Sequence, residues 1–345
     1  MTARPKVSFV VPTLNRGRYV VRAVDSCLAA ATAAVDVEVV VLDSMSDDGS
    51  WDLLTERFAG DPRVVLAQNK RGLGPTRSWL DGARLITGTY ATFLWSDDYI
   101  SPAFLDVLLP SLLEGCDLAT GDGAVRDIDD DSPLPAVQDV VTMLDGDAFL
   151  GRHMGLLPGP SLPVSPAVAL FSRALFDRWI AAVEAWCTIP GIRHDIMWRR
   201  AIGPDLMLFL AAGARPEQRV AVHRQVVAQF SAHAGSITVS SSSWPLRAGY
   251  WLAKWWAVQA AMERPRPTAV AASARLVVQG ELLSRMARHG RTKTGVDPAL
   301  VRAFDDSVAE ARRSLFEAVG KRRGVSLIAG SAARLAWRMA ARLIR

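Results

Sequence analysis

The stretch Thr92–Pro102, TFLWSDDYISP, decides the fold and the chemistry predicted for this 345-residue chain. Its apolar beginning, Thr92–Trp95, predicts a buried strand that leads directly into two adjacent carboxylates, Asp97 and Asp98. Neighbouring acids repel each other, and a hard divalent cation with oxygen ligands is the usual remedy. The alternative is that Ser-Asp-Asp forms a turn and a cap before a helix that starts near Ser101.

Strands and helices alternate through the first hundred residues. Apolar, β-branched runs predict buried strands, and segments with helical spacing of apolar residues lie between them. The predicted strands are Val7–Val11, Val37–Leu42, Val64–Ala67 and Tyr90–Trp95, and the predicted helices are 18–34, Trp51–Phe58 and Pro75–Leu85. This alternation is typical of a mostly parallel, doubly wound α/β sheet flanked by helices.

Short polar or acidic side chains follow three of these strands at their carboxyl ends. They are Thr13 and Asn15, then Asp43 and Ser44, then Asp97 and Asp98. Because such sheets bind ligands outside the carboxyl ends of their strands, we expect these side chains to form one site. The sequence lacks a GxxxxGK[ST] loop, and the glycines at 72 and 74 do not have GxGxxG spacing. A nucleotide whose phosphates are reached through a metal ion therefore fits better than a dinucleotide cofactor.

The composition indicates a large globular protein from a reducing compartment. Half of the residues are hydrophobic, and the three cysteines, Cys27, Cys116 and Cys187, are far apart without a CxxC motif. The first six residues do not resemble a signal peptide. Two long uncharged stretches, 153–172 and 225–246, are too rich in proline or in polar residues to span a membrane. We therefore expect a cytoplasmic protein.

Charge is distributed unevenly along the chain. Residues 1–244 hold 21 Lys and Arg against 28 Asp and Glu, a net charge of −7. Residues 245–345 hold 19 against 7, a net charge of +12. This change coincides with a serine run before Trp244 and predicts a boundary there, followed by a basic helical region.

The C-terminal stretch 326–345 suggests a membrane-binding helix. Arg334, Arg338 and Arg342 share one helical face, and apolar residues occupy others. This pattern is typical of a helix on an anionic membrane surface, which would place the protein peripherally on the inner face of the cell membrane. The alternative is an amphipathic helix packed on the protein body. We expect no nucleic-acid partner, because no DNA- or RNA-binding motif accompanies the arginines.

Six segments, in order, resemble the family-2 glycosyltransferases, which are inverting enzymes of the GT-A fold. They are VSFVVPTLNRGRYVVRAVDSCL (7–28), VEVVVLDSMSDDGS (37–50), NKRGLGPTRSWLDGARLITGTY (69–90), FLWSDD (93–98), HDIMWRRA (194–201) and FSAHAGSIT (230–238). The resemblance covers roughly residues 5–240 and implies a Rossmann-like GT-A sheet there, which the basic helical region would follow as a C-terminal appendage. Residues 1–100 would bind the nucleotide sugar, 101–244 would bind the acceptor and hold the catalytic base, and 245–345 would form the appendage.

The resemblance also implies a role for each matching residue. Those that would bind the nucleotide sugar are Pro12, Thr13, Asn15, Asp43, Ser44, Arg77, Asp97 and His233. Asp98, together with Asp97, would bind Mn²⁺ or Mg²⁺, and Asp195 would be the general base. From the spacing alone, the favoured interpretation of Asp195 is an ordinary acid at the start of a helix, stabilised by the helix dipole.

Three positions depart from the family pattern. Ser44 stands where the acidic turn usually carries a second acid, and Trp95 stands where the metal motif often begins with an acid. His194 replaces the Glu that often precedes the base. None of these changes removes Asp195, so activity is expected, with an unusual donor.

The implied reaction is metal-dependent transfer of a sugar from a nucleotide-diphosphate donor to a glycan or lipid-linked acceptor, in the synthesis of a cell-surface or secreted polysaccharide. One base is enough for a single displacement with inversion. Two alternatives remain: an inactive relative that binds a nucleotide sugar as a partner protein, and a nucleotidyltransferase that also uses a metal at a strand end.

Overall fold

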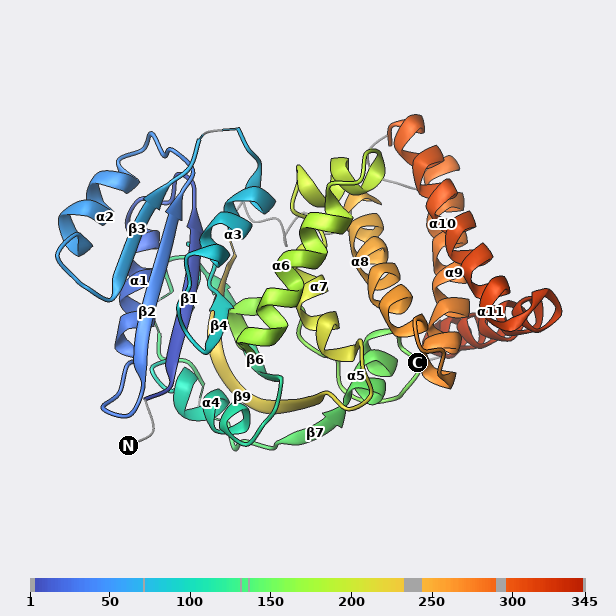
Figure 1. Ribbon diagram of the computed structural model, residues 1–345, viewed down its shortest axis with the longest axis horizontal. Helices are drawn as coiled ribbons and strands as arrows, with labels where there is room; N and C mark the ends of the chain where they lie inside the picture. Colours follow the sequence, from blue (N-terminus) through green and yellow to red (C-terminus); the bar gives the residue numbers. More distant parts are fainter. Residues whose placement is uncertain are drawn as a thin grey trace.

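The computed structural model describes residues 4–70, 72–130, 132–135, 137–232, 244–289 and 296–343, with side chains as far as residue 337. In this described part of the chain, nine strands form one mixed sheet with helices on both faces (Figure 1). The strand order is β3-β2-β1-β4-β8-β6-β9-β5, and β7 pairs with β9 outside this path. The predicted α/β sheet flanked by helices is confirmed.

The N-terminal part of the sheet is parallel, as the alternation of strands and helices predicts. It consists of β1 (Lys6–Thr13), β2 (Asp36–Asp43), β3 (Val64–Gln68) and β4 (Tyr90–Phe93), joined by α1 (Arg18–Ala29), α2 (Ser50–Phe58) and α3 (Pro75–Arg84). β1 and β2 pair in register from Lys6 with Asp36 to Thr13 with Asp43. Both strands therefore end level, which brings the polar residues that follow them to one edge.

The second part of the sheet is mixed rather than parallel. It consists of β5 (Tyr99–Ile100), β6 (Leu118–Asp127), β7 (Thr142–Asp145), β8 (Ala169–Ser172) and β9 (Arg219–Ala232). β8 is antiparallel to both β4 and β6, and β9 runs parallel to β6. The far end of β9 pairs with β5, which begins directly after Asp98. The long strand β9 therefore reaches the edge where the two acids lie.

The remaining described helices cover the sheet and extend it at the C-terminal side. They are α4 (Phe104–Leu113), α5 (Gly146–His153), α6 (Arg173–Cys187), α7 (Pro204–Leu210), α8 (Trp244–Met262), α9 (Pro267–Arg288), α10 (Pro298–Val319) and α11 (Lys321–Leu343). Three short helices are η1 (Pro166–Val168), the π-helix η2 (Arg193–Trp198) and η3 (Ala211–Gly213). Among the described residues, no helix combines the length and the apolar character that a membrane crossing requires.

The sheet separates two apolar cores. Phe9 and Val10 are successive residues of β1, and their side chains enter opposite cores because strand residues alternate between faces. The ring of Phe9 lies 5.7 Å from Phe104 of α4. On the other face, the ring of Phe93 lies 5.1 Å from Phe176 of α6. Both faces of the central strands are thus buried, which explains their continuous apolar runs.

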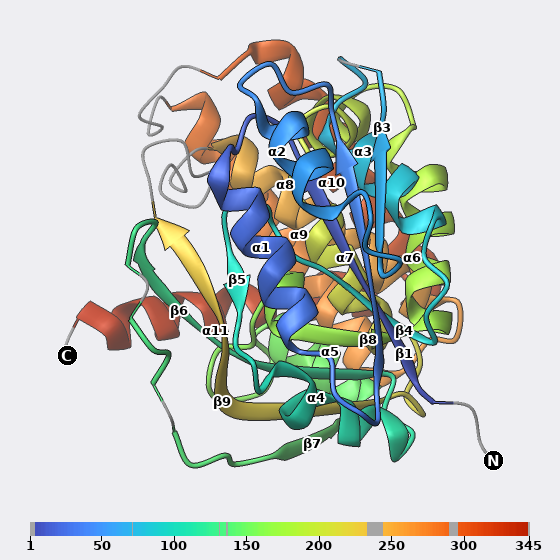
Figure 2. The same cartoon turned by 90° about the vertical axis from the view of Figure 1, so that its left-hand side faces the viewer.

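The C-terminal helices share one of these cores. Trp244 and Trp251 of α8 and Phe304 of α10 belong to the same buried cluster as Phe93 of β4. The rings of Trp251 and Phe304 lie 5.0 Å apart. α11 packs on α9 and α10 and projects from the body (Figures 1 and 2). The predicted C-terminal helices are present, and the charge change near residue 244 falls inside a continuous core.

Three hydrogen-bonded side chains, Ser111, His223 and Asp139, hold the segment before β7 against α4 and β9. Ser111 Oγ lies 3.1 Å from His223 Nε2, and His223 Nδ1 lies 2.7 Å from Asp139 Oδ2. The backbone N–H of Arg224 donates to the other oxygen of Asp139. Ser111 and His223 are buried. These hydrogen bonds join α4, β9 and the connecting segment.

Candidate active site at the carboxyl ends of the strands

The loops after β1 and β2 interlock through their polar side chains. Asn15 Nδ2 donates to Asp47 Oδ1 at 2.8 Å, and the backbone N–H of Asp47 donates back to Asn15 Oδ1 at 3.0 Å. The backbone N–H of Asn15 donates to Ser46 Oγ at 2.9 Å. Asn15 adopts a positive φ of 54°, which asparagine tolerates better than most residues. The two predicted nucleotide loops therefore form one rigid unit.

Asp43 lies at the base of this unit and is fully buried. Its Oδ2 accepts hydrogen bonds from the backbone N–H of Ser46 at 3.0 Å and from Gln68 Nε2 at 2.9 Å. Its neighbour Ser44 shares a 2.9 Å hydrogen bond with Ser78 of α3. Asp43 therefore organises the loop, and its contact with a nucleotide base stays a prediction.

The other two nucleotide-loop predictions lie on β1 itself. Pro12 is half-buried, and Thr13 is buried beside Asp43. The Oγ1 atom of Thr13 is buried and has no hydrogen-bond partner among the described atoms. Three of the predicted residues, Thr13, Asp43 and Ser44, are thus brought together by the pairing of β1 with β2.

The acidic pair forms a second corner of the same edge. The backbone N–H of Asp98 donates to the carbonyl oxygen of Trp95 at 3.0 Å, which closes the turn after β4. The side chain of Asp97 is 17% exposed, whereas Asp98 is only 5% exposed. Ser231 of β9 donates its backbone N–H to Asp98 Oδ1 at 2.8 Å and its hydroxyl to the carbonyl of Asp97. Burial first, and then the charge of Asp97, raise the pKa of Asp98 well above its usual range.

Two arginines that the sequence did not single out complete this corner. Arg16 Nε lies 3.6 Å from Asp97 Oδ2. Arg22 Nη2 donates to the carbonyl of Asp97 at 3.1 Å, and its Nη1 donates to the carbonyl of Ile128 at 2.7 Å. The guanidinium of Arg22 also lies 4.9 Å from the ring centroid of Tyr99. Both arginines precede Asp97 by some eighty residues, so only the folded sheet reveals their partner.

The residues present fit a divalent ion that arrives together with a diphosphate. In the described part of the chain, no group of three or more His, Cys, Asp or Glu residues gathers as a complete ligand set. Proteins commonly bind Mg²⁺ through one or two carboxylates together with the phosphates of the substrate. A cation beside Asp97 and Asp98 would also offset their repulsion and the burial of Asp98. His233, which the resemblance assigns to binding of the nucleotide sugar, lies outside the described residues.

The predicted base Asp195 lies on the π-helix η2, which docks on the start of α3. Thr76 Oγ1 donates to the carbonyl of Met197 at 2.7 Å. A Cβ on Gly74 would lie 3.5 Å from the carbonyl oxygen of Trp198. Because α3 begins just after β3, this contact holds η2 near the carboxyl edge of the sheet. The side chain of Asp195 is 43% exposed.

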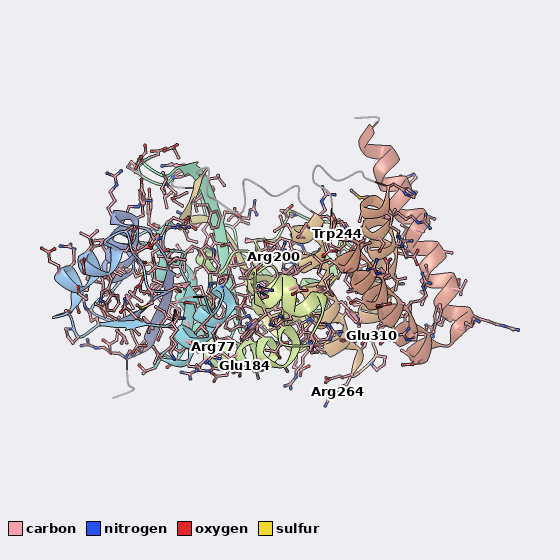
Figure 3. The ribbon with its side chains drawn as sticks, turned by 90° about the horizontal axis from the view of Figure 1, so that it is seen from above. Arg77, Glu184, Arg200, Trp244, Arg264 and Glu310 are labelled. Carbon is pink, nitrogen blue, oxygen red and sulfur yellow. The ribbon has the colours of Figure 1, made fainter. Side chains whose placement is uncertain are left out.

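Arg77 is directed along α3 instead of toward the acidic corner. Its Nε contacts both carboxylate oxygens of Asp81, at 2.8 and 2.9 Å, in an i,i+4 ion pair. Asp81 also accepts from Arg84, which pairs with Glu184 of α6. Figure 3 shows Arg77 and Glu184 on the same outer side of the molecule. The approach of Arg77 to a nucleotide therefore stays a prediction.

Trp95 fills the position where the family often places an acid. Its ring lies 4.7 Å from that of Trp79 and 6.0 Å from that of Phe93, and its Nε1 donates to Ser165 Oγ at 3.1 Å. This packing extends one core up to the acidic corner. An aromatic side chain packed in the core therefore occupies the position at which the family often has an acid.

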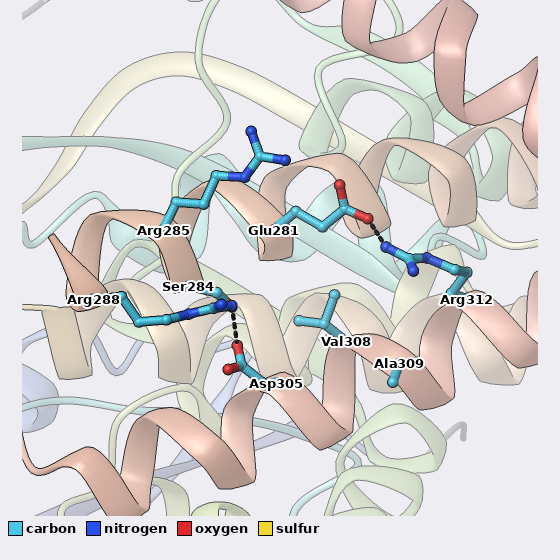
Figure 4. Close-up of a pocket in the computed structure, with 8 residues that line it drawn as sticks. All are labelled: Glu281, Ser284, Arg285, Arg288, Asp305, Val308, Ala309 and Arg312. Carbon is cyan, nitrogen blue, oxygen red and sulfur yellow. Dashed lines mark hydrogen bonds and ion pairs between the residues drawn. The ribbon is translucent and has the colours of Figure 1, made fainter.

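A separate pocket of about 330 Å³ lies between α9 and α10 (Figure 4). Two of its arginines face acids within the pocket: Arg288 pairs with Asp305 at 3.2 Å, and Arg312 pairs with Glu281. None of its lining residues belongs to the strand-end site. The acidic corner is therefore the better candidate for chemistry.

Comparison with known proteins identifies the family. Residues 8–179, about half of the chain, match the family described as glycosyl transferase family 2. The chain is 32% identical over 131 residues to the chondroitin synthase of Escherichia coli, a match that covers 38% of this chain and 18% of that protein. It is 33% identical over 162 residues to the succinoglycan biosynthesis protein ExoO of Rhizobium meliloti (strain 1021), which covers 46% and 41%. The chain thus spans less than half the length of these curated relatives.

The fold itself is similar to that of a solved structure. Residues 1–349 of S. aureus TarS, crystallised in complex with UDP-GlcNAc, superpose with a TM-score of 0.59 and 16% identity. The superposition covers 94% of this chain and 84% of that chain. This likeness shows the fold, and the family match spans the strands that end in the polar loops and the acidic pair. The chain belongs to glycosyl transferase family 2 and has the GT-A fold.

Proposed function

We propose that this protein is a metal-dependent inverting glycosyltransferase. It moves a sugar from a nucleotide-diphosphate donor to a glycan or lipid-linked acceptor. The observation that carries the proposal is the Asp97–Asp98 pair at the carboxyl edge of a GT-A sheet, together with the docking of the helix that bears Asp195 on the start of α3. A TarS structure that contains UDP-GlcNAc supports a nucleotide-sugar donor.

The relatives suggest the kind of product. Two of them are named for chondroitin synthesis and for succinoglycan biosynthesis. We infer that the present chain helps to build a cell-surface or secreted polysaccharide, and that its acceptor is therefore a growing glycan, free or attached to a lipid.

The donor would lie over the loops after β1 and β2, with its base and ribose near Pro12, Thr13 and Asn15. Its diphosphate would reach the acidic corner. There Asp98 and Asp97 would hold Mn²⁺ or Mg²⁺, which supplies positive charge that stabilises the departing diphosphate. The guanidinium of Arg16 adds a second positive charge beside Asp97, with its Nε 3.6 Å from Asp97 Oδ2.

Asp195 would act as the general base. It accepts the proton of the acceptor hydroxyl while that oxygen bonds to the anomeric carbon of the sugar. The bond from this carbon to the diphosphate oxygen breaks on the opposite side, so the nucleoside diphosphate leaves and the configuration inverts. The half-exposed carboxylate of Asp195 is open to an acceptor. A second nucleophilic carboxylate, as in retaining glycosidases, is not needed.

A binding screen followed by a transfer assay tests this function. UDP, GDP, TDP and CDP are each added with Mn²⁺ in a thermal-shift experiment, and we expect one of them to raise the Tm by mass action. With the sugar donor of that nucleotide, the wild-type chain should release a nucleoside diphosphate, whereas Asp195→Asn should bind it without transfer. Release of inorganic diphosphate would instead identify a nucleotidyltransferase, and binding without any turnover would identify an inactive partner protein.

We also propose that α11 docks the enzyme on an anionic membrane surface. Residues 321–345 contain seven Lys and Arg and no Asp or Glu. Trp337 is 74% exposed and Val325 is 53% exposed, whereas Gly324 and Ser331 face the other helices. An exposed tryptophan among basic residues suits the interface of an anionic bilayer. Such docking would hold the protein peripherally at the inner face of the cell membrane.

Vesicle flotation tests the docking proposal. We expect the full chain to float with phosphatidylserine-containing vesicles and to stay behind with phosphatidylcholine alone. Trp337→Ala should weaken flotation, and a chain that ends at residue 323 should lose it. Equal flotation of the full and shortened chains would refute the proposal, because it would assign membrane binding to another surface.

A further inference from the structure

Arg193 is a buried arginine at the start of the helix that carries the proposed base. It is 8% exposed, although it begins the short π-helix η2. Its Cζ lies 3.6 Å from the ring centroid of Trp186 in α6 and 4.8 Å from that of Trp255 in α8. The two tryptophan rings are 5.2 Å apart in an edge-to-face contact. Arg193 thus lies against two aromatic rings on separate helices.

The charge of Arg193 is compensated from the C-terminal helices. Its Nη2 lies 3.4 Å from Glu310 Oε2 of α10, a residue labelled in Figure 3. Burial lowers the pKa of Arg193, and the charge of Glu310 opposes this effect. A cation–π contact is strongest where the cation is desolvated, and Glu310 compensates part of the charge of Arg193 from a partly exposed position. The guanidinium therefore has a strong preference for this one position.

The position of the Asp195 carboxylate is determined by the position of the η2 backbone. The carboxylate lies 3.9 Å from His194 Nδ1 and 4.0 Å from Arg199 Nη1, and both distances exceed those of a hydrogen bond. Its location is therefore set by the backbone that carries it. That backbone is fixed at one end by the contact of Thr76 with Met197, and at the other end by Arg193.

We propose that Arg193 is a positioning residue for the general base, and that through it the C-terminal helices α8 and α10 set the place of Asp195. The proposal rests on the proposed transfer reaction. It assigns a catalytic consequence to helices that contribute no residue to the strand-end site. A displacement of about 1 Å at a reacting group can cost about a hundredfold in rate, so a small shift of η2 is enough to be measured.

Steady-state kinetics with two variants tests this role. Arg193→Lys keeps the charge but loses the planar contact with the rings, and we expect kcat to fall about tenfold or more with an unchanged KM for the donor. Glu310→Gln changes the partly exposed partner and should lower kcat about two- to fivefold without impairing folding. The matched controls are Arg200→Lys, an exposed arginine just beyond η2, and Glu317→Gln, an exposed position of α10. Both controls should keep the wild-type kcat.

Two further measurements distinguish positioning from general loss of structure. Arg193→Lys in an Asp195→Asn background should have no additional effect on residual transfer, because both changes act on one step. Hydrogen exchange in Arg193→Lys should speed up about tenfold or more in residues 193–198 and stay unchanged in β1 and β2.

The outcomes separate the inference from the proposed function. If Asp195→Asn transfers sugar at the wild-type rate, the proposed base is wrong. If Asp195→Asn is inactive while Arg193→Lys and Glu310→Gln keep wild-type kcat, the positioning role alone is overturned. A variant that loses donor affinity and kcat in parallel, with faster exchange throughout the sheet, would also overturn it, because Arg193 would then be a general structural residue.

Discussion

The backbone N–H of Ser231 donates a 2.8 Å hydrogen bond to the carboxylate of Asp98, although 133 positions separate the two residues. Ser231 lies near the end of β9, and Asp98 lies in the turn between β4 and β5. Strand β9, from the second half of the sheet, therefore holds Asp98, which follows the last parallel strand of the first half. The proposed metal corner exists only when both halves have folded together.

Asp98→Asn should separate stability from ligand binding. The amide oxygen can still accept from Ser231, while the buried charge and its repulsion with Asp97 disappear. Because burial disfavours ionised Asp98, we expect the Tm at pH 7 to stay the same or rise by a few degrees. The additional Tm increase given by Mn²⁺ with a nucleoside diphosphate should vanish. Asp106→Asn, at an exposed position of α4, is the control, and a retained ligand response in Asp98→Asn would rule out Asp98 as the ion ligand.

Gly74→Ala should disturb the segment that carries the proposed base. Gly74 has φ 85° and ψ 153°, a region open almost only to glycine, and alanine there costs about 1–3 kcal/mol. The new Cβ would make an ordinary van der Waals contact with the carbonyl of Trp198, at 3.5 Å, so any strain in the backbone at residue 74 is passed directly to the segment after η2. We expect a lower Tm and a reduced kcat. Gly60→Ala is the matched control, because a Cβ there meets no atom within 4 Å. Equal effects of the two substitutions would contradict this prediction.

Asp205 should make stability depend on pH. Its Oδ1 is buried in the first turn of α7, and burial raises its pKa to about 6. The pKa in the unfolded chain is about 3.9, so between these values the folded state keeps a proton that the unfolded state has lost. The contribution of this group to folding stability therefore falls as pH rises from about 4 to about 6, and stays lost above that.

Asp205→Asn should remove this dependence. Urea unfolding at pH 4 and pH 7 should show the variant gaining about 2–3 kcal/mol relative to wild type at the higher pH. Asp306→Asn, at an exposed position of α10, should show no such gain. A constant difference between Asp205→Asn and wild type across this range would mean that Asp205 titrates normally in the folded protein.

Trp95→Asp should not restore a stronger metal site. The family often has an acid at this position, but here the ring packs on Trp79 and Phe93 and donates to Ser165. Losing this aromatic packing should cost about 3–5 kcal/mol in unfolding free energy. Trp95→Phe should cost less and keep nucleotide binding. Calorimetric titration with Mn²⁺ tests this prediction, and we expect Trp95→Asp to bind the ion no more tightly than wild type. Tighter binding by a folded Trp95→Asp protein would contradict it, because residue 95 would then be accessible to the ion.

Much of the first hundred residues could be predicted from the sequence, because local signals there agree with the fold. Apolar runs buried on both faces mark β1 and β2, and their level ends follow from parallel pairing. The fourth predicted strand is shorter, since β4 ends at Phe93 and Trp95 already belongs to the turn. An apolar run does not show whether its last residues form ladder hydrogen bonds or only pack in the core.

The acidic corner could be predicted only in part. Asp97 and Asp98 carry a local signal, but Arg16, Arg22 and Ser231 reach them through tertiary contacts that no spacing encodes. The outward direction of Arg77 has the same cause, because an acid one turn further along α3 captures its guanidinium. The antiparallel insertion of β8 between β4 and β6 was likewise not predictable, because short apolar runs do not specify their neighbours.

The core that Trp244, Trp251 and Phe304 share with Phe93 has a consequence for engineering. Residue 244 is an attractive place to exchange modules between relatives, because charge and composition change there. A chimaera joined at that point would confront one protein's β4 and α6 with another protein's α8 and α10, across an interior whose side chains must interlock. Exchange of donor or acceptor preference will therefore succeed when the loops at the strand ends are grafted and the C-terminal helices stay with the sheet on which they evolved.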